Sequence, residues 1–206
     1  MAKLHFKYAS MNSGKSIDLM RTAYNYEENG YNILVMKSTL DTKADNHIAS
    51  RVGMTRKVDY MLKQEDSVKE VLKNKLNNIS CIFVDEAQFL TRMQVEELFE
   101  ISKIIDIPVL CYGLRTNFKS ESFAGGKRLL ELADILEELT TLCECGSIAR
   151  YVGRQVNNEF VLEGKEIVID GTKDVIYKPL CGKCYLEKIK KIDFEKERKS
   201  LGIKWE

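Results

Sequence analysis

The sequence predicts an α/β fold with a mostly parallel sheet and helices on both faces, followed by a small cysteine-bearing C-terminal module. Three observations lead to this prediction. Short apolar runs alternate along the chain with segments of helical periodicity, the pattern of a parallel sheet covered on both sides. A phosphate-binding loop pattern joins the first predicted strand to the first predicted helix. Four of the six cysteines lie in two close pairs near the C-terminal end.

Size and charge limit the possible functions. A chain of 206 residues can hold one core of ordinary size, or a core domain plus a small module that needs a cross-link or a bound metal ion to be stable. Lys plus Arg number 32 against 31 for Asp plus Glu, so nothing supports a nucleic-acid-coating or membrane-surface protein. No apolar run could form a membrane helix, and the start lacks the apolar segment of a signal peptide. We therefore expect a soluble cytoplasmic protein with reduced or metal-bound cysteines.

The first informative stretch lies between a strand expected at residues 4–8 and a helix expected from Ile17 to about Glu28. Its inward-facing backbone N–H groups, with the positive end of the helix, would cradle a polyphosphate. Lys15 can reach the β- and γ-phosphates, and the Ser16 hydroxyl can coordinate Mg²⁺. The alternative, a turn that contains Gly-Lys-Ser by chance, is disfavoured by the flanking strand and helix. The predicted nucleotide-binding residues are Ala9, Ser10, Met11, Asn12, Ser13, Gly14, Lys15 and Ser16.

The later elements follow from the same patterns. Buried strands are expected at residues 33–36, 81–84, 109–112 and 135–142, and helices at residues 67–76, from Thr91 to about Ser102, and at residues 127–133. Thr91 and Gln94 form a capping-box pattern at the start of the second of these helices. Residues 39–55 read as a polar loop, in which Lys43 or Arg51 could contact the nucleotide.

The second informative stretch is the predicted strand that ends in Asp85-Glu86. An acidic residue at such a strand end supports Mg²⁺ in phosphate-loop enzymes, and the pairing with the loop makes an otherwise weak signal strong. Two adjacent carboxylates allow Asp85 to hold the metal's water shell while Glu86 accepts a proton from the attacking hydroxyl. Glycines and aromatics at residues 113–126 suit a ligand loop, although such aromatics can also merely pack.

The cysteine pairs predict a structural zinc site. Cys143, Cys145, Cys181 and Cys184 supply four thiolates, enough to close a tetrahedral Zn²⁺ site with no position left for catalysis. The alternative, four unrelated thiols, does not explain the paired spacing. Cys81 and Cys111 lie in apolar runs and are expected in the core. We therefore divide the chain into a nucleotide-binding domain, residues 1–142, and a zinc module, residues 143–206, which ends in a charged helix and tail from Leu186.

Taken together, these motifs resemble the type II (cellular-type) thymidine kinases over nearly the whole chain. The resemblance rests on the phosphate loop, residues 85–92, residues 108–118 and the four cysteines. It implies a RecA-like fold and transfer of the ATP γ-phosphate to the 5′-hydroxyl of thymidine, with deoxyuridine as a related acceptor. It also implies a homotetramer with end-product inhibition, with ATP, Mg²⁺ and structural Zn²⁺ as cofactors. Glu86 matches the catalytic base, and Asp85, Gln88, Lys43 and Arg51 complete the ATP-binding set.

The resemblance further implies a nucleoside pocket closed by a lasso-like loop, here about residues 164–178. The residues assigned to this pocket are Met11, Phe89, Leu114, Phe118, Phe123, Val168, Ile169, Gly171 and Tyr177. The first cysteine pair is one residue shorter than the family's Cys-x-x-Cys, so we expect strain or rotation at that corner.

Two rival functions deserve comparison. A nucleic-acid-dependent ATPase is suggested by Asp-Glu-Ala-Gln at residues 85–88, but a helicase motor needs two such lobes and a basic surplus. A nucleotide-binding regulator without turnover would lack a base, whereas Glu86 is present, and the sequence leaves a silent site open. Without the resemblance, another acceptor also stays open.

Overall fold

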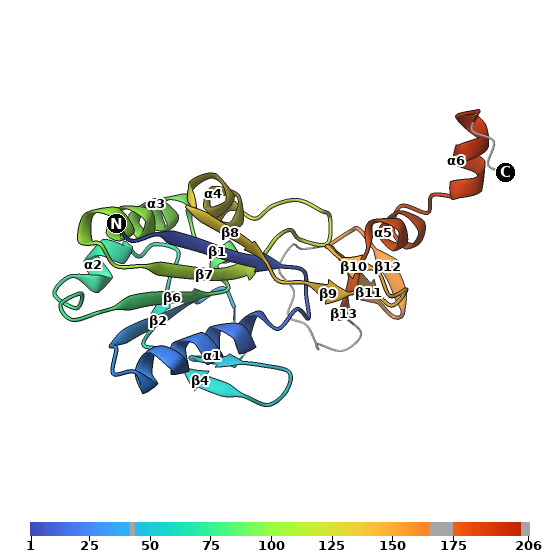
Figure 1. Ribbon diagram of the computed structural model, residues 1–206. Coiled ribbons are helices and arrows are strands. Elements are labelled where there is room, and N and C mark those ends of the chain that lie inside the picture. Colours follow the sequence, from blue (N-terminus) through green and yellow to red (C-terminus); the bar gives the residue numbers. More distant parts are fainter. Residues whose placement is uncertain (42–43, 165–174, 203–206) are drawn as a thin grey trace.

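The computed structural model describes residues 1–41, 44–164 and 175–202. At the centre lies a six-stranded sheet in the order β5-β2-β6-β7-β1-β8, with every neighbouring pair parallel (Figure 1). Its strands are β1 (Leu4–Ala9), β2 (Ile33–Ser38), β5 (Tyr60–Leu62), β6 (Cys81–Asp85), β7 (Val109–Leu114) and β8 (Ile135–Glu138). The predicted parallel α/β sheet is confirmed. Within the described residues, no helix is long and apolar enough to cross a membrane.

Helices cover both faces of this sheet. Helix α1 (Lys15–Glu28) lies on one face, and α2 (Val68–Leu72), α3 (Arg92–Glu100) and α4 (Ala124–Leu132) lie on the other (Figure 1). Strand β6 shows why its residues before Asp85 are all apolar. Ile82 and Val84 pack into the core under α2, α3 and α4, whereas Cys81 and Phe83 pack into the core under α1. Successive side chains point to opposite faces, so a strand covered on both sides needs apolar residues at every position.

The capping box of α3 is confirmed. The Thr91 side chain accepts a hydrogen bond from the Gln94 N–H at 3.2 Å, and the Gln94 side chain accepts one from the Thr91 N–H at 3.0 Å. The helix continues as a π-helix, η2 (Ile101–Ile105), and stops at Asp106, which has a left-handed backbone with φ 62°. These contacts satisfy N–H groups that a helix start would otherwise leave unpaired.

The segment predicted as a polar loop at residues 39–55 contains a strand. Strand β3 (His47–Ala49) pairs antiparallel with β4 (Thr55–Lys57), and Ile48 is buried against the core under α1. The hairpin is tied to α1 because Arg56 makes two hydrogen bonds to the Glu27 carboxylate, at 2.8 and 2.7 Å. The prediction was wrong here because one buried isoleucine among polar residues is too weak a signal.

Other boundaries also differ from the predictions. The helix expected at residues 67–76 ends at Leu72, and Asn74 then adopts a left-handed backbone with φ 63°. Helix α4 begins three residues earlier than expected, at Ala124. The strand expected at residues 135–142 stops at Glu138, because the chain leaves the central sheet there. Strand β5 has only three residues, too few to show a pattern.

The described residues of the C-terminal part form two small sheets and two helices. Its elements are β9 (Thr141–Leu142), β10 (Ile148–Ala149), β11 (Tyr151–Val156), β12 (Glu159–Val161), β13 (Val175–Leu180), α5 (Gly182–Lys188) and α6 (Phe194–Ser200). Strands β12, β11 and β13 pair antiparallel in that order. Helix α6 buries none of its residues and projects from the body, so the expected single C-terminal helix is two (Figure 1). Residues 175–178 of the expected lasso belong to β13, and residues 165–174 lie outside the described residues.

Candidate active site

The phosphate loop joins β1 to α1 through two left-handed residues. Asn12 has φ 64° and Gly14 has φ 80°, a conformation that costs glycine nothing. Gly14 is also the residue that precedes α1, and it has no side chain to cap the helix. The N–H groups of the first helical turn are therefore left without a side-chain cap, which is the arrangement that binds anions at helix starts.

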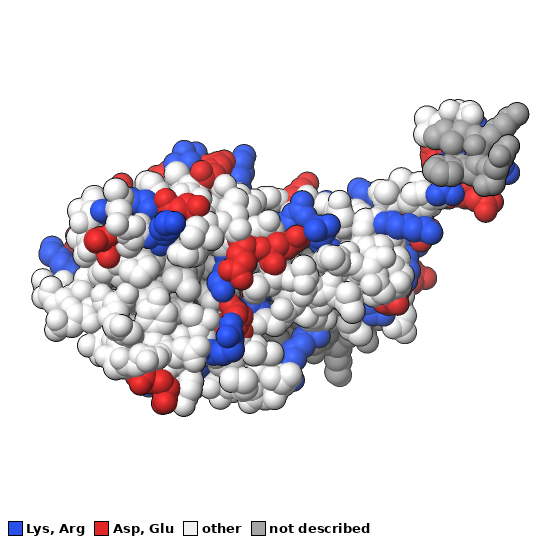
Figure 2. All heavy atoms as spheres, in the orientation of Figure 1, with Lys and Arg blue, Asp and Glu red and all other residues white. Residues whose placement is uncertain are grey.

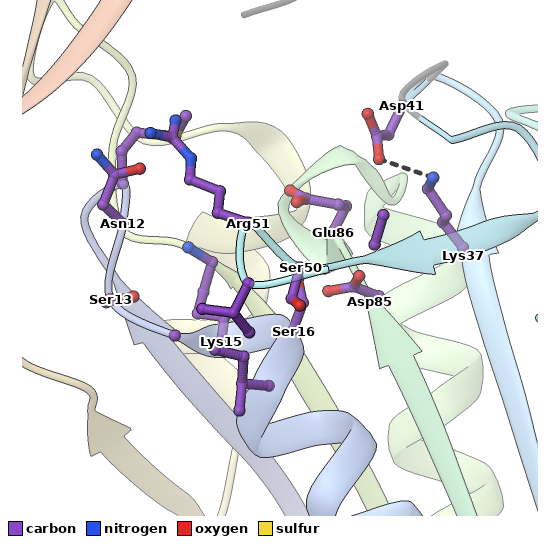
Figure 3. A pocket seen from close by; sticks show the side chains of 15 residues that line it. Asn12, Ser13, Lys15, Ser16, Lys37, Asp41, Ser50, Arg51, Asp85 and Glu86 are labelled. Atoms are coloured by element: carbon purple, nitrogen blue, oxygen red, sulfur yellow. Dashed lines mark ion pairs between the residues drawn. The ribbon is translucent and has the colours of Figure 1, made fainter. Parts of the chain in front are cut away.

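A cavity of about 280 Å³ opens beside this loop (Figure 3). Segments far apart in the sequence meet there: the loop, the ends of β2 and β6, and the turn between β3 and β4. The cavity is lined by Met11, Asn12, Ser13, Gly14, Lys15, Ser16, Ile17, Lys37, Asp41, Ala49, Ser50, Arg51, Val52, Asp85 and Glu86. The structure thus brings together most of the predicted nucleotide-binding residues. Lys43 lies outside the described residues.

Three described residues of the predicted ATP-binding set are absent from this lining. Ala9 ends β1 with 2 % of its surface exposed, and Ser10 is 3 % exposed. The Ser10 hydroxyl lies 3.4 Å from the carbonyl oxygen of Ala149, to which it donates. Gln88 is buried at 1 % exposure. These three side chains are therefore buried and do not face the cavity.

Two groups in the phosphate loop are placed for an anion. The Lys15 ammonium donates to the Ser10 carbonyl oxygen at 3.2 Å, so this cation is folded back over the loop. The Ser13 hydroxyl is buried and has no hydrogen-bond partner in the described part of the chain. Buried polar groups are nearly always paired in native proteins, so an unpaired hydroxyl here fits a phosphate oxygen as its partner.

Asp85 carries a similar unpaired atom at the end of β6. Its side chain is buried, and its Oδ1 has no hydrogen-bond partner within the residues that the structure describes. Burial raises the pKa of Asp85, and the negative charge of Glu86 raises it further. A buried carboxylate is costly unless a cation or donors offset its charge. The donor set of Asp85 and the nearby Ser16 hydroxyl therefore fits a divalent cation (Figure 3).

Glu86 is held in a strained conformation. Its backbone is left-handed, with φ 50° and ψ 38°, immediately before a 3₁₀-helix, η1 (Ala87–Phe89). This conformation costs a non-glycine residue about 1–2 kcal/mol and tends to occur at functional sites. The turn directs the Glu86 carboxylate into the cavity (Figure 3), where its Oε2 accepts a hydrogen bond from Gln88 Nε2 at 2.6 Å.

The start of α4 packs backbone against backbone on η1. A Cβ built on Gly125 would lie 2.6 Å from the carbonyl oxygens of both Ala87 and Leu90. We expect Gly125→Ala to lower the free energy of unfolding by about 1–3 kcal/mol, because neither carbonyl can move without shifting η1. Denaturant unfolding measures the change.

Gly126→Ala is the matched control in the same helix turn. A Cβ at that position would meet its nearest neighbour, the Leu114 carbonyl oxygen, at 3.5 Å, which is ordinary contact. Alanine is also the better helix former, so this variant should be neutral or slightly stabilising. Equal losses in both variants would show that the close approach at Gly125 is unimportant.

The aromatic residues predicted for the nucleoside pocket fall into two separate groups. Phe89 and Phe123 pack edge to face with centroids 5.3 Å apart. Met11 packs on a separate cluster that contains Phe118 and Tyr177. Leu114, at the end of β7, is half-buried. Val168, Ile169 and Gly171 lie outside the described residues.

Two buried cations near the site were not predicted. Lys37 is 1 % exposed, and its ammonium lies 2.9 Å from Asp41 Oδ2 and 3.1 Å from the His47 carbonyl oxygen. The signal was a lysine directly after the apolar run of β2. Arg154 lies in β11 with its guanidinium carbon 5.1 Å from the centroid of the Phe118 ring, a cation–π contact. Phe118 lies in the loop after β7, far from Arg154 in the sequence, so this contact leaves no local sequence signal.

The four predicted cysteines form one cluster. The Sγ atoms of Cys143, Cys145, Cys181 and Cys184 all lie within 4.8 Å of one another. A tetrahedral zinc site with Zn–S bonds of about 2.3 Å places its sulfurs about 3.8 Å apart, so the cluster fits zinc. The backbone N–H and hydroxyl of Ser147 lower the pKa of Cys145 to about 6, which favours the thiolate that metals bind.

The short cysteine pair reaches this cluster through a left-handed glycine. Gly146 has φ 84°, and its N–H donates to the Cys143 carbonyl oxygen at 2.9 Å. This turn brings the Cys145 Sγ to 3.5 Å from that of Cys181. The shorter cysteine pair was expected to strain this corner. The sharp turn is made at Gly146, and glycine adopts such a φ without strain.

The C-terminal part of the chain, from β9 onward, contacts both loops of the candidate site. The Thr141 hydroxyl donates to the Asn12 carbonyl oxygen at 3.1 Å, on the phosphate loop. The Tyr185 hydroxyl donates to the Phe118 carbonyl oxygen at 3.3 Å, on the loop after β7. Tyr185 immediately follows Cys184 in α5, so the cysteine cluster fixes the element that makes the second contact.

Comparisons with known proteins agree on one family. A family model described as "Thymidine kinase" matches residues 2–185. A protein of that name from Pasteurella multocida is 43 % identical over 192 residues, which cover 92 % of this chain and 99 % of the relative. One from Francisella tularensis is 39 % identical over 194 residues, which cover 91 % of this chain and 98 % of the relative.

A likeness among solved structures is much weaker. The structure of Bacteroides Pif1 bound to single-stranded DNA has a TM-score of 0.35 and 13 % identity, over 70 % of this chain and 40 % of that chain. A likeness at this level has no bearing on function.

Proposed function

The chain belongs to the thymidine kinase family, so its activity is ATP-dependent phosphorylation of thymidine, and we propose that the cavity beside the phosphate loop is where the transfer takes place. One observation carries this proposal. Glu86, strained and directed into the cavity, faces the phosphate loop beside the buried Asp85 (Figure 3). A base, a metal-binding carboxylate and a polyphosphate cradle are the parts that phosphoryl transfer needs.

The phosphate loop would bind the ATP phosphates. The β- and γ-phosphates would be held by backbone N–H groups at the start of α1, by the Ser13 hydroxyl and by the Lys15 ammonium. Arg51 would add a second cation from the opposite wall of the cavity. Ser16 and Asp85 would hold Mg²⁺, which neutralises developing phosphate charge when bound. The unpaired Oδ1 of Asp85 supports this assignment.

Glu86 would act as general base on the acceptor. As the 5′-oxygen of the nucleoside forms a bond to the γ-phosphorus, its proton passes to the Glu86 carboxylate. The bond between the γ-phosphorus and the β–γ bridging oxygen breaks, and the electron pair leaves with ADP. Catalysis then depends mainly on in-line positioning of the two reactants.

The nucleoside would lie against the aromatic region. Its apolar walls would be formed by Met11, Phe89, Leu114, Phe118, Phe123 and Tyr177. Val168, Ile169 and Gly171, which the resemblance also assigns to this pocket, lie outside the described residues. Deoxyuridine lacks only the methyl group of thymine, and an apolar pocket discriminates one methyl by only about 1–3 kcal/mol. We therefore propose deoxyuridine as a second acceptor.

Nucleic acid is not proposed as a partner. On the face shown in Figure 2, basic side chains are interspersed with acidic ones, and the net charge is +1. Strand binding relies on a basic surplus to neutralise phosphates. On the resemblance alone, we propose a cytoplasmic homotetramer in which residues 1–142 bind ATP and residues 143–206 close over the nucleoside.

ATP consumption with single acceptors tests the function. Thymidine, deoxyuridine, deoxycytidine, deoxyguanosine, single-stranded DNA and buffer are each offered separately to the protein with ATP and Mg²⁺. We expect turnover with the thymine and uracil nucleosides alone. Turnover stimulated by DNA, or none with any nucleoside, would overturn the proposal.

A further inference from the structure

We propose that Gln88 is a positioning residue for Glu86, which it fixes to the backbone of β7 so that the carboxylate faces the cavity in one orientation. This inference rests on the proposed role of Glu86 as the base. It reassigns Gln88 from the ATP-binding set, because its side chain is buried behind the cavity wall.

The hydrogen bonds of the Gln88 amide fix its orientation. Its Nε2 donates to Glu86 Oε2 at 2.6 Å, and its Oε1 accepts from the Leu114 N–H at 3.0 Å. An ionised carboxylate can only accept and a backbone N–H can only donate, so the reversed amide would lose both bonds. The amide is therefore a rigid link from β7 to one oxygen of Glu86, and it leaves the other oxygen for the substrate proton.

The space around Gln88 is built for this link. A Cβ on Gly113 would lie 2.8 Å from Gln88 Oε1 and 3.0 Å from the Gln88 backbone nitrogen. Strand β7 can therefore approach η1 closely only because residue 113 has no side chain. With 1 % of its surface exposed, Gln88 has no room to adopt another rotamer.

Glu86 needs such a restraint because its backbone turns the side chain toward the cavity but does not fix the orientation of the carboxylate. Its left-handed conformation is unfavourable for a side chain with a Cβ, and η1 spans only three residues. A carboxylate free to rotate would spend little of its time within reach of the acceptor hydroxyl. Misplacement by about 1 Å can cost a hundredfold in rate, so a link of this kind is worth a measurable factor in turnover.

Gln88→Met tests the link, since methionine has similar length and volume but makes neither bond. We expect kcat to fall about tenfold to a hundredfold, while KM for ATP and for thymidine changes less than threefold. A purely structural role would not separate kcat from KM in this way.

Gln94→Met is the matched control, because Gln94 is equally buried and its amide nitrogen donates to the carbonyls of Lys63 and Asp66 instead. It should lose stability but keep kcat per folded molecule.

The double variant Glu86→Gln/Gln88→Met separates this inference from the proposed function. If Gln88 acts through Glu86, adding Gln88→Met to the Glu86→Gln variant should lower the remaining turnover of that variant by less than twofold. An equal loss in both backgrounds, an unchanged kcat in Gln88→Met, or a loss confined to KM would overturn the inference. Normal turnover in Glu86→Gln alone would instead remove the base assignment.

Gly113→Ala provides a second route if Gln88→Met fails to fold. It keeps the glutamine but places a Cβ against its Oε1, so it should displace the link and lower kcat selectively. Unchanged kcat in a folded Gly113→Ala protein would count against the inference.

Discussion

Replacement of Glu86 by glutamine is expected to lower turnover by roughly two to four orders of magnitude while ATP binding is largely retained. Glutamine keeps the size of the side chain and can still lie in the cavity, but it cannot accept the proton of the attacking hydroxyl. The phosphate loop and Asp85 are unchanged, so the contacts proposed for ATP remain. Steady-state kcat and calorimetric ATP binding measure the two effects separately.

Glu96→Gln is the control for the same chemical change outside the cavity. Glu96 in α3 pairs with Arg92 of the same helix and with Arg128 of α4, at 2.9 and 2.8 Å. Ion pairs at a protein surface contribute little, so this variant should keep near-normal turnover. Near-normal turnover in Glu86→Gln would exclude Glu86 from the base role.

The central sheet could be predicted because burial on both faces leaves an unambiguous pattern in the sequence. Strands such as β6 must be apolar wherever both faces are covered by helices, and the phosphate loop places glycine at one of its two positions of positive φ. The β3–β4 hairpin could not be predicted in this way. Its packing depends on Ile48 reaching the core and on Arg56 binding Glu27, contacts made only after the chain folds.

The candidate site was predicted in its residue types but not in its conformation. Adjacent acidic residues after a buried strand indicated a division of labour between Asp85 and Glu86. The left-handed backbone of Glu86 and the burial of Gln88 depend on how η1 turns against α4 and β7. A side chain three residues beyond a strand can face either the ligand or the core, and tertiary packing decides between them. Gln88 was therefore assigned to ATP, although its amide faces Glu86.

Loss of zinc is expected to unfold the C-terminal module and abolish activity. We expect about one zinc per chain in the native protein, and none after Cys184→Ser, because Cys184 is a buried member of the cluster. Structural zinc in small modules contributes about 10–16 kcal/mol of apparent binding free energy, so the small core around the cysteines should not form without it. Metal analysis, thermal unfolding and kcat on the same preparations measure these outcomes.

Cys111→Ala separates a metal effect from the loss of any thiol. Cys111 is buried in β7, in the core of the central sheet, and it is not part of the cysteine cluster. This variant should keep its zinc and lose only the stability expected of a small core truncation. Zero zinc in freshly purified, reduced native protein would overturn the assignment of the cluster.

The kinetic consequence of zinc loss should extend beyond the nucleoside. Thr141 holds the phosphate loop at Asn12, and Tyr185, next to Cys184, holds the loop after β7 at Phe118. A variant that retains partial zinc should therefore raise KM for ATP as well as for thymidine. If the module served only to close over the base, partial loss of zinc would raise KM for thymidine alone. The KM for ATP therefore decides whether zinc also stabilises the phosphate loop.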